Sequence, residues 1–158
     1  FTTEARIENF EQIETFVTGQ LNATGCPRKV TSHVLIAIEE LFVNVCSYAY
    51  PAASADYPDA SASHPDSSTG HSDSVANEAG PIRIHFTYQS DPKAIIIEVC
   101  DDGTPFNPLE HDDPDRPESI DEAKIGGLGL LTTKKLMDEM EYEREGITNV
   151  TIITKRWG

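Results

Sequence analysis

A helical stripe of large apolar residues in the first third of the chain most constrains how it can fold. At about 100° per residue the stripe lies on one side of a helix; its members are Val34, Leu35, Ile38, Leu41, Phe42, Val45 and Ala49. Glu40 and Asn44 lie together along its edge, whereas Glu39 points to the opposite side. A carboxylate and a carboxamide one turn apart can orient a hydroxyl group and contribute a ligand to a hard cation such as Mg²⁺. Taken alone, the same pair is also explained as an N-terminal turn or a surface pair, which is the commoner origin of an isolated Glu-x-x-x-Asn.

Length and charge restrict the class of protein. The chain has 158 residues and a formal net charge of -15, because 27 Asp and Glu outnumber 12 Lys and Arg. We therefore expect one domain with a sizeable core, no direct nucleic-acid partner and no membrane partner, since this charge repels phosphate backbones and anionic lipids. No apolar run approaches the roughly 18 residues of a membrane span, and no basic-then-apolar leader is seen, so we expect a cytoplasmic protein. The cysteines and histidines show no metal-ligand spacing.

Hydrophobic periodicity predicts alternating helices and strands along most of the chain. We expect strands over residues 1–5, 82–88, 94–100, 141–145 and 150–157, and helices over 7–21, from about 31 to 50, and from 127 to about 140. Thr31 or Ser32 is a fair N-cap for the second helix, which should end before Pro51. The strand over 94–100 is apolar on both faces and is therefore predicted to be central in the sheet.

Two stretches show no such period. Residues 52–80 are dominated by Ala, Ser, Asp, Pro and His, which cannot bury enough apolar area to offset the entropy of ordering. We expect them to form a disordered or loosely held insertion in a single domain that spans residues 1–158. Residues 109–125 are acidic and carry two prolines, and they are expected to form a mobile loop.

Two further motifs follow predicted secondary structure. Asp101 and Gly103 come at the end of the central strand, where a carboxylate could accept a hydrogen bond from an exocyclic amine such as that of adenine. Gly126, Gly127 and Gly129 precede or open the third helix, where unpaired backbone N–H groups can bind phosphate. Each motif alone is also explained as a tight turn.

In this order, the three motifs are far more specific than any one of them. Glu40-x-x-x-Asn44, Asp101-x-Gly103 and Gly127-x-Gly129 resemble the N, G1 and G2 boxes of the GHKL (Bergerat-fold) ATPases. The runs around these boxes resemble the anti-sigma regulatory factor / serine-protein kinase family; they are Glu39–Asn44, Tyr48–Pro51, Asp101–Pro108, Gly126–Leu130 and Met137-Asp138. This resemblance covers nearly the whole chain except residues 52–80. It implies an α/β (α+β) two-layer sandwich, with a mixed, mostly antiparallel sheet, helices on one face, and nucleotide held between a lid and the helices.

The resemblance also implies roles for residues at both ends of a bound Mg-ATP. Glu40 would be the general base and Asn44 the Mg²⁺ ligand. Asp101 would hold the adenine amine with help from a bound water, and Gly103 would leave room for the ring.

Other implied roles concern the phosphates and the lid. The phosphates would meet the start of the third helix, at Gly127, Leu128 and Gly129. Residues 109–125 would be the ATP lid, and either Lys124 or Arg116 could supply its basic residue. Thr148 is the candidate for a hydroxyl that supports adenine, although Gly146-Ile147-Thr148-Asn149 departs from the Gly-Thr usual in that family.

The function implied by this resemblance is an anti-sigma factor with Mg-ATP-dependent serine/threonine-protein kinase activity. It would bind a sigma factor and be released when an anti-anti-sigma (STAS-type) partner engages it and is phosphorylated, and we expect a homodimer. One alternative is a stand-alone histidine-kinase-like ATPase domain, against which Tyr48-Ala49-Tyr50 after the N box argues. Another is an ATP-binding switch or adaptor without phosphotransfer, against which the presence of Glu40 weighs.

Overall fold

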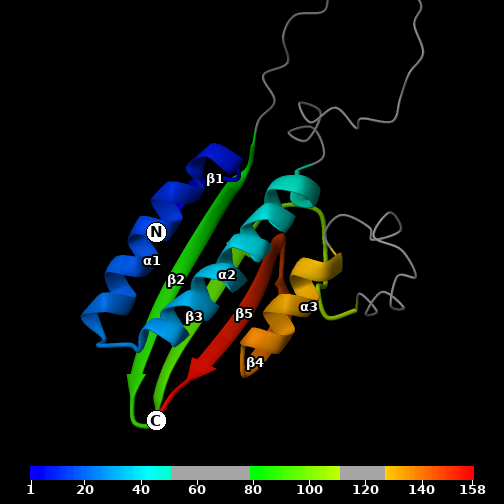
Figure 1. The fold of residues 1–158 in the computed structure, drawn as a ribbon. Coiled ribbons are helices and arrows are strands. Elements are labelled where there is room, and N and C mark those ends of the chain that lie inside the picture. The colour runs from blue at the N-terminus through cyan, green and yellow to red at the C-terminus, as the bar shows by residue number, and fades with distance from the viewer. Residues whose placement is uncertain (51–78, 111–126) are drawn as a thin grey trace, which may run out of the picture.

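The computed structural model describes residues 1–50, 79–110 and 127–158. Within these residues, helices α1, α2 and α3 cover one face of a five-stranded sheet (Figure 1). This is the predicted two-layer arrangement with helices on one face. Residues 52–78 of the expected insertion and residues 111–125 of the expected lid lie outside the described part of the chain.

The strands lie in the order β1-β2-β3-β5-β4, and all four pairings described are antiparallel, so the mixed pairing that we expected is not seen among them. Their bounds are β1 Thr2–Glu4, β2 Pro81–Ser90, β3 Lys93–Asp101, β4 Glu139–Glu145 and β5 Thr148–Arg156. The middle strand is β3, as its apolar character on both faces predicts. Asp101, at its end, pairs with Ile82 on one side and with Asn149 on the other.

Alternation along β3 decides which side chains face the helices. Ile95, Ile97 and Val99 belong to the hydrophobic core together with residues of α1 and α2. Because successive strand side chains point to opposite faces, Asp101 continues this helix-facing series. The sheet therefore places the carboxylate of Asp101 against the helix layer, at the end of β3.

Helix α2 (Arg28–Asn44) begins earlier than predicted. Its N-cap is Pro27, which has an extended backbone and no capping side chain. Thr31 and Ser32 instead lie inside the helix, where their hydroxyls donate to the carbonyls of Pro27 and Arg28 at 3.4 and 3.1 Å. A hydroxyl that bonds to the carbonyl four residues back satisfies itself within a helix, so neither residue starts one here. The prediction of an N-cap at Thr31 or Ser32 was wrong.

The other end of α2 runs into a π-helical turn, Val45–Ala49, and helical structure stops before Pro51 as predicted. The hydroxyl of Tyr50 then donates to the carbonyl of Pro81 at 2.8 Å and accepts from the backbone N–H of Asp102 at 2.9 Å. This side chain connects the end of the helical segment to the start of β2 and the end of β3.

The continuous helix over Arg28–Ala49 is long and apolar enough to cross a membrane by length and composition alone. A core helix of a soluble protein passes the same test. Here Val34, Ile38 and Phe42 are each at most 1% exposed and pack in the core with the sheet. Helix α1 (Phe10–Ala23), which follows a 3₁₀ turn at Ile7–Asn9, adds Ile13, Val17 and Leu21 to that core.

Helix α3 (Gly127–Leu136) starts where predicted but ends sooner. The N–H of Asp138 already bonds to the carbonyl of Thr154 at 2.9 Å, and β4 begins at Glu139. Met140 therefore lies in a strand, opposite Ile153, and not in the helix. Its spacing from Met137 suits a helix, but the pairing with β5 prevails over that local pattern.

Candidate functional site

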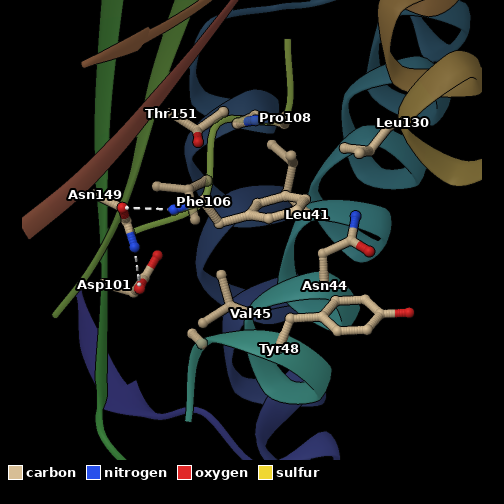
Figure 2. Close-up of a pocket in the computed structure, with 12 residues that line it drawn as sticks. Leu41, Asn44, Val45, Tyr48, Asp101, Phe106, Pro108, Leu130, Asn149 and Thr151 are labelled. Carbon is tan, nitrogen blue, oxygen red and sulfur yellow. Dashed lines mark hydrogen bonds between the residues drawn. The ribbon is translucent and has the colours of Figure 1, made fainter. Parts of the chain in front are cut away.

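A pocket lies between the C-terminal half of α2 and the ends of β3 and β5 (Figure 2). About 390 Å³ of space lies between its walls, part of it open to solvent, and it brings together two of the residues predicted from the sequence, Asn44 and Asp101. Its lining is Leu41, Asn44, Val45, Tyr48, Ala49, Val99, Asp101, Phe106, Pro108, Leu130, Asn149 and Thr151. Most of this wall is apolar, and a few polar groups converge on it, as is typical of small-molecule sites.

Asp101 is the buried carboxylate of this pocket, at 5% exposure. Its Oδ1 accepts two hydrogen bonds, from the backbone N–H of Gly103 at 2.9 Å and from Asn149 Nδ2 at 2.8 Å. Burial raises the pKa of the Asp101 carboxyl, and the hydrogen bonds from Asn149 and Gly103 oppose that rise. Oδ2 accepts no hydrogen bond from the residues that the structure describes. This oxygen is the acceptor that remains for a ligand.

Asn149 is a pocket residue that the sequence analysis missed. Its side chain is 3% exposed and fully engaged: Nδ2 donates to Asp101 and, at 2.9 Å, to the carbonyl of Thr104. Its Oδ1 accepts from the Tyr142 hydroxyl at 2.8 Å and from Arg144 Nη1 at 2.7 Å. No local pattern in the sequence marks Asn149, because its position opposite Asp101 follows from the register between β3 and β5.

Asn44 lines the same pocket from the helix layer, and its amide points toward the side of Leu130 and α3 (Figure 2). It is 8% exposed, and its Nδ2 is buried without a hydrogen-bond partner among the described residues. An unpaired buried amide costs about 1–3 kcal/mol, so a molecule that pairs with it is favoured to bind there. Such an orphaned group at a pocket wall is a strong indication of a ligand site.

Glu40 lies one turn before Asn44 and contacts the start of α3. A Cβ placed on Gly129 would overlap the Glu40 carboxylate, with the carboxylate carbon only 2.8 Å away. The glycine therefore allows α2 and α3 to approach closely at this carboxylate. The first turn of α3 contains three backbone N–H groups that have no helical partner; they belong to Gly127, Leu128 and Gly129. Lys124 and Arg116 lie outside the described residues.

The structure explains why residue 103 is a glycine, which the sequence analysis did not. A Cβ at this position would lie 2.5 Å from both Cβ and the carbonyl oxygen of Ala49. The next residue, Thr104, donates its N–H to that same carbonyl at 2.9 Å. Gly103 thus lets the end of β3 approach the π-helical turn, which positions Asp101 against the helix layer.

Thr148 does not face this pocket, so the structure does not bring it together with the other predicted residues. Its hydroxyl donates to Asp102 Oδ1 at 2.6 Å on the opposite face of the sheet. The β5 hydroxyl in the pocket is that of Thr151, which is 8% exposed and pairs in register with Val99. The two threonines are three positions apart along the strand, and an odd offset puts their side chains on opposite faces.

Two aromatic side chains lie at the pocket. Tyr48 and Phe106 stack with their ring centroids 6.3 Å apart and their planes at 19°. Figure 2 shows Phe106 extending into the space between the sheet and α2. Flat apolar faces next to a carboxylate acceptor suit a planar heterocycle that carries an amino group.

Comparison with known proteins agrees with this geometry. The family model of the histidine kinase-like ATPase domain matches residues 3–155, and the chain belongs to this family. The resemblance to the GHKL ATPases and the predicted fold are thereby confirmed.

Among curated proteins, the chain is similar to the serine/threonine-protein kinase BtrW of Bordetella bronchiseptica (strain ATCC BAA-588 / NCTC 13252 / RB50). The two are 27% identical over 73 residues, which are 46% of this chain and 51% of BtrW. The match therefore spans about half the length of that relative.

Proposed function

We propose that this domain binds Mg-ATP in the pocket between α2 and the ends of β3 and β5, and that it transfers the γ-phosphate to a serine or threonine of a partner protein. One observation carries the proposal: Asp101 and Asn44 are both buried and line one pocket from opposite layers. Asn44 Nδ2 has no hydrogen-bond partner among the described residues, and both hydrogen bonds that the Asp101 side chain accepts from them go to Oδ1. Membership of an ATPase family and similarity to a protein named a serine/threonine kinase support it.

The base would bind at the sheet side of the pocket. Asp101 Oδ2 accepts a hydrogen bond from the amino group, while Oδ1 stays with Gly103 and Asn149. Tyr48 and Phe106 provide flat apolar surface for the ring. The phosphates would extend toward the first turn of α3, where unpaired N–H groups and the helix dipole favour negative charge.

The donor set fits Mg²⁺ held mainly by phosphate oxygens. No group of three His, Cys, Asp or Glu that could hold a metal ion occurs among the described residues. Mg²⁺ is commonly bound through one or two protein ligands, substrate phosphates and water, and the Asn44 side chain can supply such a ligand with its oxygen. When bound, the cation neutralises charge that develops on the phosphates.

Glu40 would activate the acceptor hydroxyl. Its carboxylate lies against Gly129, next to the N–H groups that would receive the phosphates. The hydroxyl oxygen of the partner forms a bond to the γ-phosphorus, the bond to the bridging oxygen of ADP breaks, and Glu40 takes the hydroxyl proton. Positioned carboxylates contribute about 10²–10⁴-fold to such steps.

The partners that we propose are a sigma factor, bound and inhibited, and a STAS-type anti-anti-sigma protein, phosphorylated. This part rests on the resemblance of the three boxes and their flanking runs. A homodimer and a cytoplasmic location stay predictions of the same kind.

The test is transfer of labelled γ-phosphate from Mg-ATP to purified STAS-type proteins, with partners whose candidate serine is replaced by alanine as controls. We expect label on the intact partner and none on the serine-to-alanine form. Tight ATP binding without any transfer would replace the kinase with an ATP-dependent switch.

A further inference from the structure

We propose that Asn149 is a positioning residue that sets the base preference of the pocket. It occupies one of the two oxygens of Asp101, so the carboxylate can receive only a single N–H donor from a bound base. The inference rests on the proposed function, because it explains how that same pocket would select adenine over guanine nucleotides.

The register of the sheet places the two side chains together. Asn149 and Asp101 are direct partners across the β3–β5 pairing, and both are at least 95% buried. Asp101 Oδ1 accepts from Asn149 Nδ2 at 2.8 Å and from the Gly103 N–H at 2.9 Å. A carboxylate oxygen has about two acceptor sites, so Oδ1 is saturated while Oδ2 is not.

The orientation of the Asn149 amide is determined by its other neighbours. Arg144 can only donate hydrogen bonds, and its Nη1 lies 2.7 Å from the amide oxygen. A flipped amide would turn its NH₂ toward this guanidinium and its oxygen toward the Asp101 carboxylate. Arg144 Nη1 also donates to the carbonyl of Gly103 at 3.1 Å, so one side chain holds both donors to Oδ1 in place.

This arrangement distinguishes the two purines by the number of donors at their edges. Adenine presents one amino group next to a ring-nitrogen acceptor, and a single free carboxylate oxygen suffices for it. Guanine presents two adjacent donors, N1–H and the 2-amino group, which match a carboxylate with both oxygens free. With Oδ1 saturated, one guanine donor is left without a partner in a buried site, which is costly.

The experiment measures the dissociation constants of Mg-ATP and Mg-GTP by calorimetry for wild type and Asn149→Ala. We expect wild type to prefer ATP and the variant to lose about tenfold or more of that ATP-to-GTP ratio, since Asp101 can then offer both oxygens. Thr154→Val is the matched control, because Thr154 is another buried polar residue of β5, on the opposite face. It should keep the wild-type ratio.

A second variant keeps the proposal testable if Asn149→Ala does not fold. Arg144→Met leaves Asn149 in place but removes one of three donors to its amide oxygen; the Tyr142 hydroxyl at 2.8 Å and the Phe106 N–H at 3.3 Å remain. This variant should lower the ratio about threefold or more. Wild type that binds no adenine nucleotide would overturn the proposed function and this inference with it. A wild type that prefers ATP, with an unchanged ratio in whichever of the two variants folds, would overturn the assignment of Asn149 alone.

Discussion

Asp101 and Asp102 are consecutive residues at the end of β3, and the sheet gives them opposite tasks. Asp101 faces the helices and is buried, and within the described residues the hydrogen bonds to its carboxylate come from neutral groups and go to one oxygen only. Asp102 faces the other side, where Arg83 donates hydrogen bonds to both carboxylate oxygens at 2.9 and 2.7 Å. The Thr148 hydroxyl donates a third hydrogen bond to this carboxylate. Burial raises the pKa of Asp101, whereas Arg83 and Thr148 lower the pKa of Asp102 to about 2.

The difference extends to the two faces of the sheet around these residues. On the helix face, polar atoms are left without partners among the described residues, as at Asn44 Nδ2. On the opposite face, the Asp102 carboxylate is hydrogen-bonded through both its oxygens. A buried polar group without a partner lowers stability and can bind a ligand, whereas a paired group contributes to stability and has no free position for a ligand. The helix face should therefore govern function and the opposite face stability.

The largest effect should distinguish the two adjacent glutamates of α2. Glu40→Gln keeps the shape of the side chain but removes the base, so phosphotransfer to a STAS-type partner should fall by about 10²–10⁴ while ATP affinity changes little. Glu39→Gln, on the exposed side of the same helix, should transfer phosphate at the wild-type rate. Equal activity of the two variants would remove Glu40 from the chemistry.

The next effect separates the two aspartates by ATP affinity. Asp101→Asn replaces an ionised acceptor and should weaken ATP binding about tenfold or more. Asp102→Asn should leave the affinity within about twofold, because its carboxylate lies on the other face. Calorimetric titration of both variants decides the matter, and similar losses in the two would contradict the division between the faces.

A pH titration sharpens the same contrast. Protonated Asp101 can no longer accept a hydrogen bond through a charged oxygen, so ATP affinity should fall as the pH drops through the raised pKa of Asp101. The contribution of Asp101 to stability has the opposite sign: it is present below the unfolded pKa and lost as pH rises through the folded one. Asp101→Asn should therefore weaken binding at neutral pH without destabilising the fold, which chemical unfolding can measure.

A smaller effect is expected at the metal. Asn44→Ala removes one ligand from a cation that has few protein ligands, so Mg-ATP binding should weaken about fivefold to tenfold. ADP binding measured in EDTA should stay close to wild type, since the base contacts remain. Equal losses with and without Mg²⁺ would show that Asn44 contacts the nucleotide itself.

The smallest effect concerns the ion pair on the opposite face. Because the folded pKa of Asp102 is lowered to about 2, its contribution to stability is present above the unfolded pKa, near 4, and is lost as pH falls toward 2. Asp102→Asn should cost about 1 kcal/mol or less at pH 7, since both partners are partly exposed. Urea unfolding at pH 7 and pH 3 should show a smaller difference between variant and wild type at the lower pH.

Much of the fold could be predicted because its patterns are local. The alternation in β2 and β3, the stripe on α2 and the glycines before α3 each depend on neighbours within a few residues. Asp101 was found for the same reason, as a carboxylate that ends a strand apolar on both faces. The predicted end of α3 was wrong because Met140 lies in β4 and pairs with Ile153 of β5. A local pattern cannot predict this pairing, because its two strands are separated in the sequence by a turn.

The sequence by itself determined the three motifs, their order and the elements that carry them, since short-range spacing decides which residues share a face of a helix or strand. Only the tertiary structure decided which face of the sheet each β5 side chain occupies. The register with β3 puts Asn149 beside Asp101 and turns Thr148 away. The tertiary structure also shows that a glycine at position 103 is needed for the close approach to Ala49. These outcomes depend on pairing between residues far apart in the chain, and a shift of one residue in that pairing would exchange the two faces.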